Sequence, residues 1–151
     1  MSGDIKELSV MFNKFIERKR ILQGMKEDNL IQYLKKVFPD LEKTDQFDSS
    51  DVFSRCKNSR AELKCRGEDY DDFLIEKLKW DKLQECREKR IFYISSSYNG
   101  VWIFDVKDIP EPIWEVQMHN KTTEFSDNTK IPKLVGFYRK ELGKDITNLI
   151  L

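Results

Sequence analysis

The chain has 151 residues, a length that suits one domain with a single hydrophobic core. Hydrophobic residues make up 39% and charged residues 36%, and the ten Phe, five Tyr and three Trp exclude an intrinsically disordered chain. The 27 basic and 27 acidic residues cancel, which excludes a uniformly basic nucleic-acid-binding protein but allows a local basic groove.

The first half of the chain reads as two helices followed by two short strands. Apolar residues recur at helical spacing over 4–20 and again over 26–38, where Pro39 ends the second helix. Residues 40–50 are polar and turn-like and could hide a short strand. Residues 51–54 and 60–66 have the composition of strands, so they predict a β-hairpin.

The second half predicts a helix, a hairpin, a strand and a short helix. These elements are expected, in chain order, over residues 69–89, 91–97 with 101–106, 113–118, and 131–142, with a polar loop at 119–130. The order predicts an α/β or α+β domain in which helices flank a mixed sheet. We expect a single domain over 1–151, with the helix 4–20 packed on a core of about 26–142.

The cysteines and the apolar runs bear on location. Cys56, Cys65 and Cys86 are odd in number and form no CxxC pair, which argues against a disulfide framework and a structural zinc site. The N-terminus lacks the apolar segment of a signal peptide, and the apolar runs are too short to cross a bilayer. These features predict an intracellular, cytoplasmic protein with no membrane partner.

The strand 60–66 carries the residues with the clearest chemistry. Side chains alternate between the faces of a strand, so Glu62 and Lys64 share one face, about 7 Å apart. If the strands 51–54 and 60–66 pair, the carboxylate of Asp51 comes close to Glu62. Two neighbouring carboxylates repel unless a cation lies between them, and Mg²⁺ or Mn²⁺ suits such oxygen ligands. The same spacing also fits a solvated strand face.

Lys79 favours the site over the solvated face. In a helix over 69–89 it shares a face with Ile75 and Leu83 and so interrupts an apolar stripe. A lysine in this position either extends to solvent or points at an anionic group.

Three segments together resemble the PD-(D/E)XK nuclease superfamily, in particular its small phage or virus-type members. They are Ala61-Glu62-Leu63-Lys64-Cys65-Arg66, residues 70–77, and Lys79-Trp80-Asp81-Lys82-Leu83, with a weaker likeness at 119–125. The resemblance covers roughly residues 26–106. It implies a restriction-endonuclease-like core and metal-dependent hydrolysis of DNA, of an endonuclease or resolvase type.

The resemblance also assigns roles. Glu62 and Lys64 match the (D/E)XK pair, and Asp51 matches the first aspartate of the motif, with Asp48 as its rival. Glu27 resembles an additional metal ligand on the first helix, and Lys79 resembles the polar residue of the second helix that faces the site. The chain departs from the pattern because no proline precedes Asp51.

Other residues are weaker candidates. Arg66 lies on the same strand face as Lys64 and could clamp a phosphate. Lys121, Thr122 and Thr123 could contact a nucleic-acid backbone, although a solvated loop fits them slightly better. Cys65 falls on the apolar face of its strand, which predicts a core position.

The leading hypothesis is a Mg²⁺-dependent or Mn²⁺-dependent nuclease that acts on DNA, including branched or single-stranded DNA, with a homodimer as one expected form. A second hypothesis is a nuclease-fold protein that binds DNA without cleaving it. A third is a protein-interaction module in which Glu62 and Lys64 are a solvated strand face.

Overall fold

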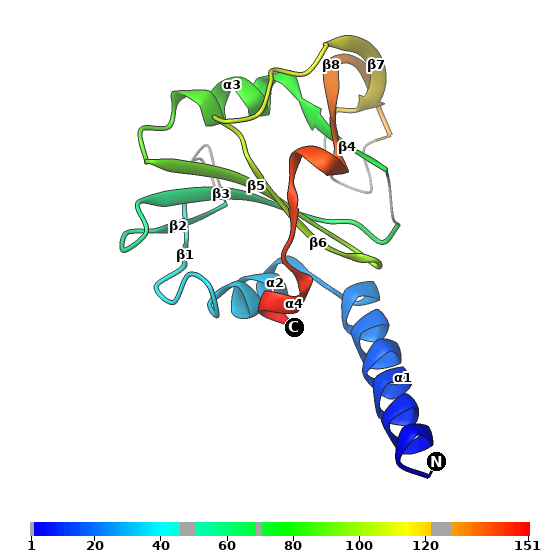
Figure 1. Ribbon diagram of the computed structural model, residues 1–151. Helices are drawn as coiled ribbons and strands as arrows, with labels where there is room; N and C mark the ends of the chain where they lie inside the picture. The colour runs from blue at the N-terminus through cyan, green and yellow to red at the C-terminus, as the bar shows by residue number, and fades with distance from the viewer. Residues whose placement is uncertain (1, 46–50, 69–70, 122–127) are drawn as a thin grey trace.

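The computed structural model describes residues 2–45, 51–68, 71–121 and 128–151 (Figure 1). Within these residues, six strands form a mixed sheet in the order β1-β2-β3-β5-β6-β9, and three form an antiparallel sheet in the order β4-β8-β7. The large sheet comprises β1 (Glu42–Lys43), β2 (Val52–Ser54), β3 (Ser59–Cys65), β5 (Arg90–Ser97), β6 (Gly100–Asp105) and β9 (Lys144–Asp145). The small sheet comprises β4 (Asp72–Glu76), β7 (Glu115–Asn120) and β8 (Lys130–Arg139). The expected α+β class with a mixed sheet is confirmed.

The large sheet is covered on both faces (Figure 1). On one face pack α2 (Glu27–Leu34), α4 (Thr147–Ile150) and the C-terminal end of α1 (Ser2–Gln23). On the other face pack α3 (Lys77–Glu85) and the small sheet, and a 3-10 turn at Lys140–Leu142 leads from β8 to β9. Each face therefore has its own apolar core, with β3 and β5 between them.

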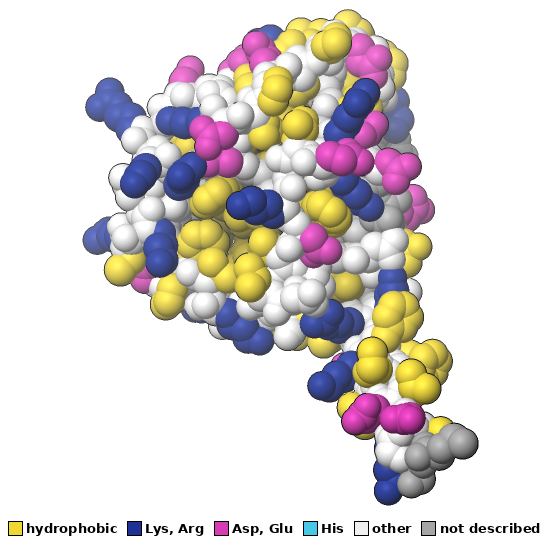
Figure 2. All heavy atoms as spheres, viewed as in Figure 1, with side chains coloured by type: hydrophobic (Ala, Val, Ile, Leu, Met, Phe, Trp, Pro, Cys, Tyr) yellow, Lys and Arg dark blue, Asp and Glu magenta, His cyan; other side chains and the backbone are white. Residues whose placement is uncertain are grey.

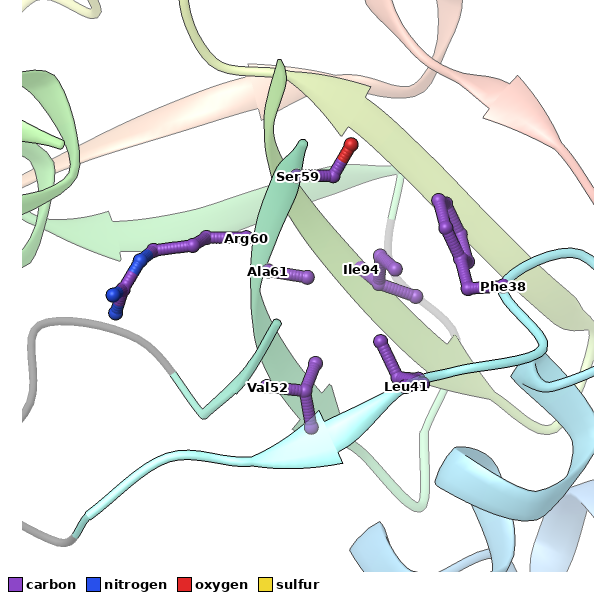
Figure 3. A pocket seen from close by; sticks show the side chains of 7 residues that line it. All are labelled: Phe38, Leu41, Val52, Ser59, Arg60, Ala61 and Ile94. Carbon is purple, nitrogen blue, oxygen red and sulfur yellow. The ribbon is translucent and has the colours of Figure 1, made fainter. Parts of the chain in front are cut away.

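The strand β3 takes its central position from its two neighbours. It pairs antiparallel with β2 and parallel with β5, and β4 and α3 form the crossover between β3 and β5. Ala61 and Leu63 point into the core beneath α2, where Ala61 lines a small apolar cavity with Phe38, Val52 and Ile94 (Figure 3). Glu62 therefore points to the opposite face, as the alternation along a strand requires.

Most local predictions for the first half of the chain, and the hairpin of the second half, are confirmed. The helices expected over 4–20 and 26–38 are α1 and α2, and the short strand in 40–50 is β1. The strands expected at 51–54 and 60–66 are β2 and β3, and the hairpin around Tyr98-Asn99-Gly100 joins β5 to β6. These elements have strong local signals and mostly adjacent partners, which is why sequence patterns place them well.

The helix expected over 69–89 is wrong in its first half. The structure has the strand β4 at Asp72–Glu76 and a helix only at Lys77–Glu85. Along β4 the buried side chains alternate, with Phe73 and Ile75 fully enclosed. This strand pairs with β8, which follows more than fifty residues later. The local sequence pattern of β4 therefore does not indicate its partner.

The short helix expected over 131–142 is also wrong. Residues 130–139 form β8, which pairs with β4 along its second half and with β7 along its first half. Pro132 lies in the first half, beyond the residues that pair with β4, so its missing N–H faces no neighbouring strand on that side.

The helix α1 does not pack on the domain along its length, contrary to expectation. It projects from the body, and its large apolar side chains between Ile5 and Ile16 are exposed (Figures 1 and 2). Only its last turns reach the core, where Leu22 is buried. Within the described residues, no helix has both the length and the apolar character needed to span a bilayer.

Candidate functional site

Glu62 lies at the centre of a charged cluster on the α3 face of β3. Only 4% of the residue is exposed, although its neighbours Ala61 and Leu63 point into the core on the opposite face. A carboxylate this deeply enclosed is costly unless positive charge or hydrogen bonds compensate it. Its position is fixed by pairing with β2 on one side and with Tyr93 of β5 on the other.

Asp51 is the acidic neighbour of Glu62. The register of β2 and β3 pairs Val52 with Ala61, which places Asp51 opposite Glu62. The backbone N–H of Asp51 donates to the carbonyl of Ala61 at 3.0 Å, and its carboxylate Oδ2 accepts from the N–H of Leu63 at 2.8 Å. The two strands pair as the sequence predicted, so these two carboxylates do come together.

Lys79 supplies the nearest cation. Its Nζ lies 3.3 Å from Glu62 Oε2, with 31% of the lysine side chain exposed and 5% of the glutamate side chain. Of the two alternatives for Lys79, extension to solvent or contact with an anionic group, the structure has the contact with Glu62. The apolar stripe expected on the helix over 69–89 does not form, because Ile75 belongs to β4 and Leu78 is 73% exposed. Lys79 reaches Glu62 because Trp80 and Leu83 anchor α3 on the sheet.

The surroundings of Glu62 favour the protonated, uncharged form of its carboxyl group. Burial raises the pKa of Glu62 to about 7, and the negative charge of Asp51 adds to that rise. The charges of Lys79 and Lys64 act in the opposite direction and lower it. These two lysines therefore do not offset the effect of burial and of Asp51 on the pKa of Glu62.

Glu27 belongs to the same cluster, although it comes from α2. Burial raises the pKa of Glu27, and so does the charge of Asp51, whereas Lys43 and Lys64 lower it. Asp51 and Lys64 thus act on both Glu27 and Glu62. Asp51 and Lys64 therefore connect the two carboxylates electrostatically, although α2 packs on the face of the sheet opposite to Glu62.

The residues fit a hard divalent cation held by few protein ligands. No group of three or more His, Cys, Asp or Glu side chains is arranged to hold a metal ion in the described part of the chain. Mg²⁺, however, is commonly bound by one or two carboxylates and keeps several waters. Glu62 Oε2 is fully buried and, among the described residues, receives no hydrogen bond of good geometry. Paired with Asp51, this oxygen suits such an ion.

Arg66 and Tyr93 form a polar network behind the cluster. Tyr93 is buried beside Glu62 and donates its hydroxyl hydrogen to the carbonyl of Leu74 at 3.0 Å. Arg66 Nη2 donates to the same carbonyl at 3.1 Å and to the Tyr93 hydroxyl at 3.0 Å. Arg66 therefore ties β4 to the large sheet, and its expected role as a phosphate clamp stays a prediction.

Ser95 is a site residue that the sequence did not suggest. It pairs with Lys64 across β3 and β5, is fully buried, and its Oγ has no hydrogen-bond partner among the described residues. Ser95 follows Tyr93 by two positions and so lies on the Glu62 face. It was missed because Ser95-Ser96-Ser97 reads as the polar end of a hairpin, and only the register with β3 places it beside Lys64.

Four further candidates from the sequence remain, Lys121, Asp48, Thr122 and Thr123. Lys121 lines a cleft of about 550 Å³ between the start of α3 and the β7–β8 pair, and this lining does not include Glu62, Asp51 or Lys79. Asp48, Thr122 and Thr123 fall outside the described residues. Cys65, expected in the core, is exposed at the end of β3.

No family model matches the chain, and no curated protein or solved structure matches it significantly.

Proposed function

We propose that the protein is a metal-dependent nuclease that hydrolyses phosphodiester bonds in DNA. The observation that carries this proposal is the convergence of Asp51, Glu62 and Lys79 from three separate elements around one buried carboxylate. A buried carboxylate whose charge is not fully compensated destabilises a fold. Such groups are found preferentially at functional sites. The resemblance of these residues to the PD-(D/E)XK pattern supports the same reaction.

In this proposal Asp51 and Glu62 hold Mg²⁺ or Mn²⁺, with Glu27 as a further acidic neighbour. Such an ion polarises the phosphodiester and lowers the pKa of a bound water. Lys64 is exposed on the Glu62 face, so it can orient the attacking water and neutralise charge that develops on the phosphate. Lys79 holds Glu62 in place and offsets its negative charge.

A second candidate is a DNA-binding protein of the same architecture that does not cleave. It is favoured by the absence of a group of three ligating side chains among the described residues. The same site would then bind the nucleic-acid backbone through Lys64 and Lys79. This candidate predicts a salt-sensitive complex with DNA and no cleavage with any divalent cation.

The test is cleavage of supercoiled plasmid, branched DNA and single-stranded DNA with Mg²⁺ or Mn²⁺. We expect Glu62→Gln and Lys64→Met to lower the cleavage rate by at least about a hundredfold, since each removes a group that acts in the transition state. Glu85→Gln and Lys82→Met serve as matched controls, because both residues are exposed on α3. Wild-type rates in Glu62→Gln and Lys64→Met would exclude this site as the source of any cleavage.

A further inference from the structure

The first turns of α1 have no partner within the described chain. Ile5, Leu8, Phe12 and Phe15 are each at least 57% exposed. Figure 1 shows the helix projecting from the body, and Figure 2 shows hydrophobic side chains gathered on it. An isolated helix of this length is marginally stable in water, because most helical stability in proteins comes from packing an apolar face. This segment therefore needs a packing partner.

The spacing of the apolar residues indicates what kind of partner fits. The residues of one face are alternately three and four apart, in the order Ile5, Leu8, Phe12, Phe15, Lys19 and Leu22. This spacing of 3.5 residues is the repeat by which one helix packs along another. The last two positions are already used, because Lys19 lies over the Tyr98 ring and Leu22 is buried in the core. The first four, here called the α1 seam, are exposed.

The seam with its flanks is close in area to one side of a standard interface. Met11 and Ile16 flank it, and across these six residues the exposed fraction runs from 42% to 69%. Large side chains at such exposure present on the order of 100 Å² each. The helix thus approaches the roughly 800 Å² per partner that a standard interface buries.

The charges of α1 select an antiparallel second copy. Asp4 and Glu7 lie with Lys6 near the start of the helix, whereas Lys14, Arg18, Lys19 and Arg20 lie with Glu17 in its second half, so the first half is net acidic and the second half net basic. Two parallel copies would place like charges side by side, whereas two antiparallel copies place the acidic end of each beside the basic end of the other. The interface is then isologous, as in a two-fold dimer.

The register of such a pair follows from the seam. Setting Ile5 opposite Phe15 of the second copy sets Leu8 opposite Phe12 of the second copy, so all four seam residues meet an apolar partner. Asp4 then lies within one turn of Arg18 of the second copy, beside the seam. The two domains stand at opposite ends of the helix pair, because each domain follows the C-terminal end of its own α1.

From the exposed seam, its spacing, its area and its charge asymmetry, we infer that the protein forms a homodimer through an antiparallel pair of α1 helices. This inference is independent of the nuclease site. A lipid surface is the competing partner, but Asp4 beside the seam would repel anionic headgroups, and the 3.5-residue spacing has no purpose on a membrane.

The first test is the mass of the whole chain by analytical ultracentrifugation over a range of concentrations. We expect twice 18.1 kDa for the wild type and 18.1 kDa for Phe12→Glu, because this substitution puts a charge in the centre of the seam. Val10→Glu is the matched control, since Val10 is 53% exposed on the opposite side of the helix and should leave the dimer intact. A monomeric wild type, or a dimer that survives Phe12→Glu, overturns the inference.

The second test distinguishes the orientation and the partner. Small-angle X-ray scattering should give an elongated dimer with its domains apart, whereas a parallel pair would bring them side by side and overturn the antiparallel arrangement. Asp4→Lys should weaken the dimer at low salt, and Arg18→Glu in the partner chain should restore it on mixing. Binding of a monomeric wild type to vesicles of phosphatidylcholine and phosphatidylserine would overturn the inference.

Discussion

One face of β3 is apolar and the other is charged, although their residues alternate along one strand. Ala61 and Leu63 point into a closed apolar core beneath α2, whereas Glu62 and Lys64 share the face toward α3. Burial of the first pair stabilises the fold, at about 25 cal/mol per Å² of apolar surface. Burial of Glu62 opposes folding, because a charged carboxylate loses its hydration there. The proposed function would account for a buried carboxylate on the second face.

The largest expected effect on stability lies on the apolar face. Leu63→Ala should lower the free energy of unfolding by about 3 kcal/mol, through lost burial and a cavity between β3 and α2. Leu149→Ala is the control, because Leu149 is 64% exposed and its truncation should change little. Urea denaturation measures both. Equal losses in the two variants would show that the face of β3 beneath α2 is not a tightly packed core.

On the opposite face, removal of a charge should stabilise the protein. The pKa of Glu62 is about 7 in the folded protein and near 4.5 when solvated, so the folded state binds the additional proton between these values. The contribution of Glu62 to the free energy of unfolding must therefore fall as pH rises from about 4.5 to 7. In EDTA at pH 8, Glu62→Gln should raise the free energy of unfolding by about 2 kcal/mol, an effect that vanishes below pH 4.5. A pH-independent difference would contradict the assignment of this shift to Glu62.

A bound divalent cation should offset the destabilisation that the charged form of Glu62 causes. At pH 8, Mg²⁺ or Mn²⁺ at a hundred times its dissociation constant should stabilise the wild type by about 2.7 kcal/mol at most. The gain should be small in Glu62→Gln and in Asp51→Asn, because each lacks one proposed ligand. Thermal unfolding with increasing cation concentration measures this effect without reference to cleavage. An equal gain in wild type and both variants would place the ion elsewhere.

The smallest effect is expected at Lys79. Lys79→Met removes the cation 3.3 Å from Glu62, so above pH 7 it should destabilise the metal-free protein by about 1 kcal/mol. It should also shift the pH dependence attributed to Glu62 upward, because Lys79 lowers the pKa of that group. Lys82→Met, an exposed lysine on the same helix, should lie within about 0.5 kcal/mol of the wild type.

Part of the site could be predicted from local pattern. The alternation along 60–66 is enough to place Glu62 and Lys64 on one face, and the adjacent hairpin is enough to bring Asp51 close. Contact of Lys79 with an anionic group was one of two alternatives, but it was derived from a helix that begins eight residues too early. The actual cause is the packing of Trp80 and Leu83 on the sheet, which no helical periodicity over 69–89 could reveal.

The sequence by itself determined the class of the fold, the helices and hairpins with adjacent partners, and the shared face of Glu62 and Lys64 on β3. These follow from side-chain alternation, turn residues and apolar periodicity, which act over a few positions. Only the tertiary structure decided that β4 and β8 are strands, that Arg66 joins the two sheets, that Ser95 lies beside Lys64, and that α1 leaves its seam exposed. Each of these depends on partners far away in the chain, and local physical preferences do not encode which distant segment a residue will meet.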